Sequence, residues 1–407
     1  MTRASWTVAL AACALILAPR AADARTPIPI ETLAEAPRIQ SISMSTDGKN
    51  IVAVLGMPGT GALETSLATW QLDDLDKGPT ITASGDRMKF IAATAMKADR
   101  IFVVARQEWT GELAGCGEGK TTGNTKTFVT KAYLTDTSHK SFAEAFADNT
   151  RKLGISQATQ RCLELAGTAR LVSGLPLDPE NVVIAQLDTL SFRDHYYLYN
   201  LRTNETRLLF RAGGRTQPGM FDPRTGEVLV RTQIEPVGGD FEMRIFIRNP
   251  DSGQFEQHDG LTTRLSERYT LNFVGIDEAS GKYYILTDLF SDRLQAHVYD
   301  PKIRQFDPEP LVAHPELPVS GLILGSRPSD FNRVLGFTVS GMVTQTVWVD
   351  PNLRAIHEGL KQAFPGQSVN ILNYPDDRSK LLFATESPTH PPTYHLLLDA
   401  PRVATLG

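Results

Sequence analysis

Residues 277–300 read DEASGKYYILTDLFSDRLQAHVYD, and this stretch contains one unit of a pattern that recurs along the chain. It opens with a polar turn at Asp277, continues into the apolar run Tyr283–Leu286, and ends with alternating apolar residues that lead into Asp300. Asp and Gly favour turns, because Asp side chains bond to nearby backbone and Gly tolerates positive φ. Short runs of β-branched and aromatic residues indicate strands. The stretch therefore predicts antiparallel strands joined by tight turns.

Two interleaved series of such turns run through the sequence. In the first series a polar turn precedes a β-rich run, and its members are Asp47, Asp99, Asp178, Asp222, Asp277, Asp330 and Asp376. In the second series alternating apolar residues lead into the turn, and its members are Asp73, Asp136, Asn200, Asn249, Asp300, Asp350 and Asp399. The second series has spacings of 63, 64, 49, 51, 50 and 49 residues. A common step near fifty predicts seven structural repeats.

Each repeat holds four expected strands, A to D, with the first turn between A and B and the second between C and D. One such sheet cannot bury both of its faces alone, so the repeats should pack radially. The expected fold is an all-β, seven-bladed β-propeller of four-stranded antiparallel blades, because short period-two runs do not fit a helical solenoid. The chain starts in strand A of blade one and ends in strand D of blade seven. We therefore expect a ring that is not closed by strand exchange and depends on side-chain packing there.

Blade two is longer than the others. The interval from Asp99 to Asp136 is 37 residues and that from Asp136 to Asp178 is 42. We predict insertions at about residues 109–126, between strands B and C, and at about 138–166, before blade three; the second has a helix-like pattern in Phe142, Phe146 and Leu153. Both insertions should emerge on one face of the ring. Cys116 lies in the first and Cys162 in the second, so they are a disulfide candidate, with two free thiols as the alternative.

The N-terminus has the pattern of a secretion signal. Arg3 precedes the apolar run Trp6–Ala18, and small residues at Ala22 and Ala24 suit a signal peptidase. We predict a signal peptide at residues 1–24, cleavage after Ala24, a propeller domain at residues 25–407, and a periplasmic or extracellular location. The apolar run is shorter than the about 20 residues that span a bilayer. Residues 10–13 resemble a lipoprotein cleavage box, but the apolar run continues past Cys13, which disfavours lipid attachment.

Motifs for catalysis or cofactor binding do not emerge from the sequence. It contains no G-x-S-x-G, the nucleophile motif of α/β-hydrolases, and its eight histidines have no local zinc-ligand spacing. Residues 114–121, AGCGEGKT, fit a loose phosphate-loop pattern, but no expected helix follows to supply backbone N–H groups. A net charge of −5 with interspersed signs gives no electrostatic footprint for nucleic acid. We therefore assign no catalytic residue, cofactor or metal site.

Three stretches together resemble one peptidase family. The opening residues 28–54, IPIETLAEAPRIQSISMSTDGKNIVAV, combine an L-A-x-x-P lead with an S-x-D-G turn, and residues 286–300 and 376–399 are similar to later blades. In this order they resemble the propellers of the prolyl-oligopeptidase family of serine peptidases, over about residues 27–399. The resemblance implies a propeller that caps an α/β-hydrolase domain and restricts its substrates to peptides. The sequence stops at Gly407, so none of the family's triad residues can be assigned here.

The expected function is therefore a non-catalytic propeller domain, resembling the substrate-gating lid of such a peptidase and truncated before the hydrolase domain. Its expected partners are peptides and a hydrolase domain or subunit encoded separately, with no nucleic acid and no membrane span. A stand-alone periplasmic propeller that acts as a protein-binding scaffold is the alternative. An enzyme that works on the propeller itself, with metal or quinone ligands on the inner strands, is the third hypothesis.

Overall fold

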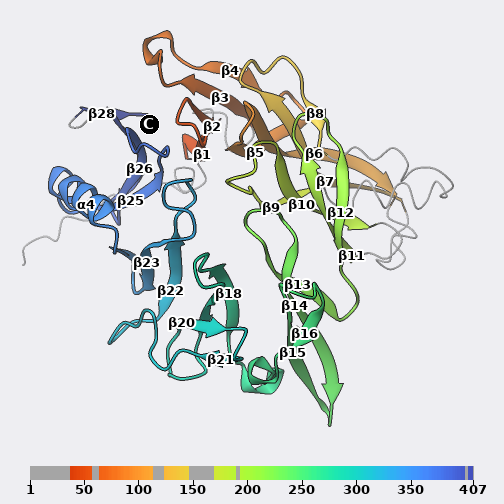
Figure 1. Cartoon of the computed structure of the whole chain (residues 1–407). Helices are drawn as coiled ribbons and strands as arrows, with labels where there is room; N and C mark the ends of the chain where they lie inside the picture. The colour runs from red at the N-terminus through yellow and green to blue at the C-terminus, as the bar shows by residue number, and fades with distance from the viewer. Residues whose placement is uncertain are drawn as a thin grey trace, which may run out of the picture.

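The computed structural model describes residues 37–56, 64–112, 123–145, 169–188, 193–398 and 402–406. Seven antiparallel sheets follow one another along the chain and lie around a ring, as Figure 1 shows. The predicted seven-bladed β-propeller is confirmed. Within the described ranges, no helix is long and apolar enough to cross a bilayer.

The strands of each blade are consecutive in the sequence. Blade one contains β1 (Ile39–Met44), β2 (Asn50–Gly56), β3 (Thr65–Gln71) and β4 (Thr80–Ala83). Blade two contains β5 (Met88–Ala95), β6 (Arg100–Glu112), β7 (Asn124–Asp136) and β8 (Ala143–Glu144). Blade three contains β9 (Arg170–Ser173), β10 (Asn181–Asp188), β11 (Arg193–Asn200) and β12 (Thr206–Arg211). Blade four contains β13 (Thr216–Phe221), β14 (Val228–Val237), β15 (Asp240–Arg248) and β16 (Phe255–Gln257), with β17 (Thr263–Arg264) also paired to β15.

The remaining three blades complete the ring. Blade five contains β18 (Leu271–Ile276), β19 (Tyr283–Thr287), β20 (Gln295–Asp300) and β21 (Gln305–Phe306). Blade six contains β22 (Val319–Leu324), β23 (Val334–Ser340) and β24 (Thr344–Trp348), followed by helix α4 (Pro351–Ala363). Blade seven contains β25 (Ser368–Asn373), β26 (Lys380–Ser387), β27 (His390–Leu398) and β28 (Arg402–Thr405). Short 3-10 helices occupy Leu75–Lys77, Asp259–Leu261 and Leu265–Glu267.

The turn residues adopt the geometry that their side chains favour. Asp178 Oδ1 accepts hydrogen bonds from the backbone N–H groups of Glu180 and Asn181, at 2.8 and 2.7 Å, and so closes the turn between β9 and β10. Asn200 Oδ1 closes the turn between β11 and β12 by accepting from the N–H of Arg202 at 2.9 Å. A side chain that satisfies the backbone of its own turn needs no other role. Asp399 lies outside the described residues.

The core of the molecule lies between neighbouring blades rather than within one. Val52 and Val54 of β2, for example, pack in one buried cluster with Phe90 of β5 and Val103 of β6. The second strand of most blades is apolar on both faces, since each face meets a different neighbour, and Tyr283–Thr287 is buried at every position. Burial of apolar surface drives this packing. The blades therefore hold each other in place around the ring.

Blade six departs from the four-stranded plan. Where a fourth strand was expected after Asp350, helix α4 begins instead. The Asp350 side chain accepts hydrogen bonds from the N–H groups of Asn352 and Leu353 at 3.1 and 3.0 Å, and Pro351 occupies the first turn. Both features favour a helix start. The same aspartate that ends a strand thus starts a helix, and the third strand of this sheet, β24, becomes its outermost strand.

The two insertions predicted for blade two lie mostly outside the described residues, which cover 109–112 and 123–126 of the first and 138–145 of the second. Strands β6 and β7 pair over their full length, from Arg100 opposite Asp136 to Glu112 opposite Asn124, so residues 109–112 and 124–126 extend this hairpin. Strand β8 lies inside the range 138–166, and Phe142 stacks on Phe90 with ring centroids 5.7 Å apart. Phe142 therefore belongs to a strand connection, not to a helix. The other two residues of the helix-like pattern, Phe146 and Leu153, lie outside the described residues. The disulfide candidates Cys116 and Cys162 and the predicted signal peptide at residues 1–24 also lie outside them.

Blades one and seven meet without sharing a strand, as expected, because each described sheet uses only its own consecutive strands. Side chains join them instead. Asn373 Nδ2 donates to Met44 O at 3.2 Å, and Lys380 Nζ donates to Asp73 Oδ1 at 3.0 Å. Gly48 has a φ of +68°, and a Cβ on it would lie 2.8 Å from Pro375 Cβ. This border is closed by packing that leaves no space for a side chain at position 48.

Candidate functional site

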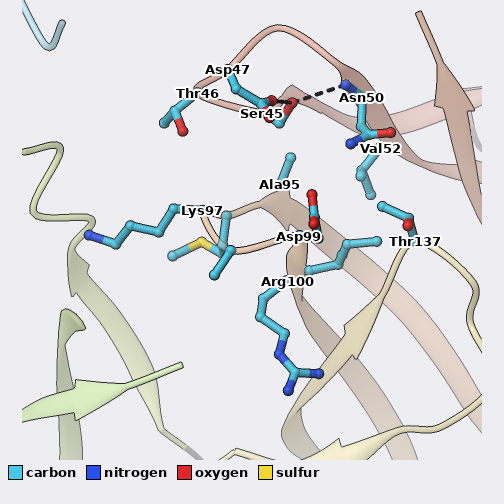
Figure 2. A pocket seen from close by; sticks show the side chains of 13 residues that line it. Ser45, Thr46, Asp47, Asn50, Val52, Ala95, Lys97, Asp99, Arg100 and Thr137 are labelled. Carbon is cyan, nitrogen blue, oxygen red and sulfur yellow. Dashed lines mark hydrogen bonds between the residues drawn. The ribbon is translucent and has the colours of Figure 1, made fainter. Parts of the chain in front are cut away.

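A small cavity lies between the first turns of blades one and two, and Figure 2 shows its lining. Ser45, Asp47 and Asn50 lie on one side, and Lys97 and Asp99 belong to the opposite turn. Ser45 Oγ donates to Asp47 Oδ1 at 2.6 Å and accepts from the N–H of Asn50 at 3.0 Å. The cavity has a volume of about 110 Å³, below the roughly 300–1,000 Å³ of ligand pockets. It is a small gap between two turns, and on the blade-one side its polar groups bond to one another.

Lys97 joins blade two to blade three instead of serving this cavity. Figure 2 shows its side chain extending away from Asp47 and Asn50. Its Nζ donates to Gly174 O and Leu175 O, both at 2.7 Å, in the turn between β9 and β10. Burial lowers the pKa of Lys97 to about 8, although the charge of Asp178 acts in the opposite direction. The ammonium group is therefore a structural tie between two blades.

A larger cavity, of about 440 Å³, lies between blades four and five. It is bordered by both turns of each blade, which the two series of acidic and amide residues mark in the sequence. Its apolar lining comes from Leu229, Ile247, Ile276 and Tyr283, and its charged and polar lining comes from Asp222, Arg248, Asn249, Asp251, Glu256, Lys302 and Arg304. The volume falls within the range of ligand pockets, and the combination of apolar and convergent polar groups is typical of them. We take it as the candidate site.

The charges of the candidate site are only partly compensated. Arg304 donates to Glu256 Oε2 at 2.6 Å and to Gln257 O at 3.4 Å, which fixes the guanidinium at the edge of the cavity. Within the described part of the chain, no carboxylate lies within ion-pair distance of Lys302 Nζ. Burial raises the pKa of Tyr283 to about 12, so its phenol stays protonated at neutral pH. This site offers cationic and hydrogen-bonding groups beside an apolar surface, which suits binding of an amphipathic segment.

The buried histidines act as ties between strands. His139 Nε2 lies 2.7 Å from Thr69 Oγ1 and its Nδ1 lies 3.2 Å from Thr82 Oγ1, so blade two is tied to blade one. His258 Nδ1 lies 2.8 Å from the hydroxyl of Tyr299, which ties blade four to blade five. Burial lowers the pKa of both imidazoles, which favours their neutral form. Over the described ranges, no group of three or more His, Cys, Asp or Glu residues could hold a metal ion.

Sequence reasoning did not identify the cavity between blades four and five. Its lining is spread over Asp222, Asn249 and Arg304, which are distant in sequence and belong to two repeats. The sequence feature that could have located this cavity is the alignment of the two turn series, because equivalent turns of adjacent blades must lie side by side in a propeller. The identity of the lining residues could not follow from that alignment alone.

Comparison with known proteins finds neither a matching family model nor a matching curated protein. Solved structures do match. The chain is similar to peptidase propellers. The β-propeller domain of the Trilobed protease from Pyrococcus furiosus, described as having an open velcro topology, is 10% identical, with a TM-score of 0.47 and coverage of 91% of this chain and 97% of that one.

Two full-length peptidases give similar values. Pyrococcus horikoshii acylaminoacyl peptidase is 10% identical, with a TM-score of 0.46 and coverage of 93% of this chain and 53% of that one. A prolyl endopeptidase is 10% identical, with a TM-score of 0.48 and coverage of 90% and 49%. The chain thus spans about half the length of these two peptidases. The matching structures thus include propellers of prolyl and acylaminoacyl peptidases, the kind of protein that the sequence resembles.

Proposed function

We propose that this chain is a non-catalytic, exported propeller that binds peptides and restricts their access to a hydrolase. The hydrolase would be a separate domain or a separately encoded subunit. The cavity between blades four and five carries the proposal, because it places basic, acidic and amide side chains around an apolar surface, with Lys302 outside ion-pair distance of any described carboxylate. A peptide offers the complementary groups: carboxylates, backbone carbonyls and apolar side chains. Arg3, the apolar run Trp6–Ala18 and the small residues Ala22 and Ala24 support export.

The use made of the titratable side chains supports a non-catalytic role. General acid–base catalysis needs an imidazole or carboxylate that can reach a substrate proton. His139 and His258 instead spend their ring nitrogens on Thr and Tyr hydroxyls of a neighbouring blade. The turn aspartates similarly accept from the backbone of their own turns. The sequence also lacks the G-x-S-x-G motif in which an α/β-hydrolase presents its nucleophile.

Two measurements on the mature protein test the proposal. A fluorophosphonate probe should label no serine, and peptide and ester substrates should not be hydrolysed. Fluorescence anisotropy with a labelled panel of octapeptides should detect binding, and Arg304→Met should weaken it about tenfold, since one charge-assisted hydrogen bond contributes roughly 1.5–3 kcal/mol.

Arg170→Met is the matched control. Arg170 is paired with Asp194 in blade three, away from the cavity, and its side chain is 60% exposed. Specific serine labelling would refute the non-catalytic role. Equal binding by the wild type, Arg304→Met and Arg170→Met would show that peptides do not use this cavity.

A further inference from the structure

The outer edge of β24 in blade six is the feature that the proposed function does not use. The fourth strand is present in each of the other six described blades and has two residues in β8 and β21, three in β16, four in β4 and β28, and six in β12. In blade six the chain turns into α4 after β24, so no described strand pairs with this edge. A segment of only a few residues would give blade six the same number of strands.

The pairing of β24 with β23 fixes which backbone groups point outward. The N–H of Val349 donates to Leu335 O at 2.8 Å, so this pair is hydrogen-bonded. Hydrogen-bonded and non-bonded pairs alternate along an antiparallel ladder. By the register of Phe337 opposite Val347, the residues Thr344, Thr346 and Trp348 are then in non-bonded pairs, and their N–H and C=O groups project from the outer edge.

Trp348 confirms this direction. Its carbonyl accepts a hydrogen bond from Arg354 Nε of α4 at 2.9 Å, on the side away from β23. The N–H and C=O groups of Thr344 and Thr346 have no backbone partner outside the β23 ladder among the described residues. These four groups form an open ladder at the edge of the sheet.

A cavity of about 680 Å³ lies directly beside this open ladder. Residues Val343–Thr346 form one side of it, His357 and Lys361 of α4 form another, and blade seven contributes Gly366–Asn370 and Glu386–Pro388. These walls enclose a slot next to a single strand edge. The volume is within the range of ligand sites, and we take a single chain segment as the occupant because walls from α4 and blade seven lie beside the strand edge.

The sequence of this edge lacks the features that block strand addition. Proteins protect exposed edges with charged residues or proline. Residues 340–349, SGMVTQTVWV, contain neither. Val343 and Val349 are about half exposed, at 54% and 49%, and would flank an added strand with apolar surface.

The slot lining carries one basic and one acidic side chain, Lys361 and Glu386, and Lys361 favours an acidic residue in a segment that lies beside it. Glu386 already accepts a hydrogen bond from Asn370 Nδ2 at 3.2 Å. Lys361, by contrast, lies in the last turn of α4, and no ion pair to it is present in the described ranges of the chain. A carboxylate on an added strand could reach it from the slot.

We propose that the slot between β24, α4 and blade seven binds an extended, acidic segment of a partner polypeptide as the fourth strand of blade six. Its backbone pairs antiparallel with Thr344 and Thr346, and an acidic side chain pairs with Lys361. Main-chain hydrogen bonds would supply the affinity and the flanking side chains the selectivity, as in other cases of β-strand addition.

Phage-displayed random heptapeptides, selected on the immobilised mature protein, test this. Enriched peptides should combine β-branched residues with an acidic residue. Thr346→Pro removes one outward N–H, and an edge strand tolerates proline where the N–H faces solvent, so this variant should fold and bind these peptides at least tenfold more weakly. Lys361→Glu should weaken the binding of these peptides three- to tenfold. The same peptides with alternate amides N-methylated should lose binding, because they keep their side chains but not their backbone donors.

Two controls keep the result interpretable. Gln345→Pro removes an N–H that points to Val339, so it should lower the melting temperature where Thr346→Pro does not. Lys302→Glu, in the cavity between blades four and five, should leave binding to the slot unchanged. The proposal is overturned if no peptide is enriched, or if Thr346→Pro and N-methylation have no effect.

Other occupants of the slot would give distinct results, and each of these results would also overturn the proposal of a partner segment. A concentration-dependent dimer that Thr346→Pro abolishes would assign the edge to a second copy of the chain. Tighter peptide binding after deletion of residues 25–36 would assign it to the chain's own N-terminal segment. Arg304→Met reports separately on the peptide-binding role proposed for the other cavity, so either proposal can fail alone.

Discussion

Arg378 lies between two buried carboxylates at the border of blades six and seven. Its guanidinium is 3.2 Å from Asp330 Oδ2 and 2.9 Å from Asp350 Oδ1, and these two aspartates are only 1% and 7% exposed. Burial alone would raise the pKa of Asp350, but hydrogen bonds from Arg378 and from the start of α4 outweigh it and lower that pKa. A buried charge is tolerated only when it is paired. Arg378 thus allows two acidic turn residues to be buried together.

We predict that Arg378→Met destabilises the fold by about 3–5 kcal/mol, the usual cost of leaving buried charges without their partner. Urea denaturation monitored by tryptophan fluorescence measures this change. Lys49→Met is the control, because Lys49 pairs with Asp47 at 3.6 Å on the surface, and such pairs contribute about 0–1 kcal/mol. Similar losses in the two variants would contradict a special role for Arg378.

The sequence predicted part of this cluster. Asp330 and Asp350 were recognised as turn residues from their place in the two series. Their common cation was not, because Arg378 is 48 residues from Asp330 and 28 from Asp350, and local patterns do not report such pairings. Side-chain pairs between blades depend on the rotation from one sheet to the next, which sequence spacing does not give.

At the scale of strands and helices, the buried histidines link elements that the backbone ladders leave separate. His395 of β27 lies between Thr385 of β26 and Thr405 of β28, at 3.0 and 3.1 Å. His357 of α4 lies 3.1 Å from the carbonyl of Val369 in β25. Burial lowers the pKa of both imidazoles from their ordinary value of 6.5. Burial therefore favours the neutral ring.

The free energy of unfolding should therefore fall as the pH drops below about 6.5. In this range the unfolded chain takes up protons on histidines that stay neutral in the folded state, so protonation favours unfolding. The turn aspartates have lowered pKa values and change the free energy of unfolding only below their ordinary pKa of 3.8. The change between pH 6.5 and 4.5 therefore comes mainly from protonation of histidine. Urea midpoints at pH 7.5 and 5.0 measure the effect.

A pair of variants identifies the groups responsible for this pH dependence. His139→Gln should reduce the dependence, because it removes one imidazole with a lowered pKa. His390→Gln should not, since His390 is on the surface, where it bonds to Ser387 and Thr389. A flat profile between pH 7.5 and 5.0 in the wild type would refute the explanation.

The elements themselves were largely predictable, with α4 as the instructive exception. Residues 347–350, VWVD, match the strand-ending pattern of the other repeats, so a fourth strand was expected. The following residues carry a different signal: Asp350 before Pro351, then Leu353, Ile356 and Leu360 at helical spacing, of which Leu353 and Leu360 are buried. The repeat obscured a local helix signal, because a regular series invites the same assignment for each member.

At the scale of the whole molecule, the border of blades one and seven closes the ring through side chains. Met44, Ile51 and Leu72 of blade one form a buried cluster with Leu382 and Leu396 of blade seven. No strand crosses this border in the described residues. Side-chain packing therefore holds blades one and seven together, as backbone hydrogen bonds hold the strands of one sheet. Loss of this packing should open the ring between these two blades first.

We predict that Leu396→Ala destabilises the protein by about 2–5 kcal/mol, the cost of a buried Leu→Ala cavity, and also loosens closure. Hydrogen exchange should become faster in β1 and β25 before other blades change. Ile245→Ala is the matched control, since Ile245 is equally buried between blades four and five. It should cost a similar free energy without selective exchange at blades one and seven. Uniform acceleration in Leu396→Ala would show that this border is not a separate opening unit.

Building every sheet from consecutive strands also has a genetic consequence. A crossover whose breakpoints fall in the connections between blades would exchange an entire sheet and cut no ladder of backbone hydrogen bonds. The incoming sheet would need to match the apolar faces of its two neighbours and the polar contacts between blades, such as those of Arg378. In a ring closed by an exchanged strand, the closing sheet contains strands from both ends of the chain, so such a crossover would divide that sheet. Here each of the seven described sheets could be exchanged as a whole.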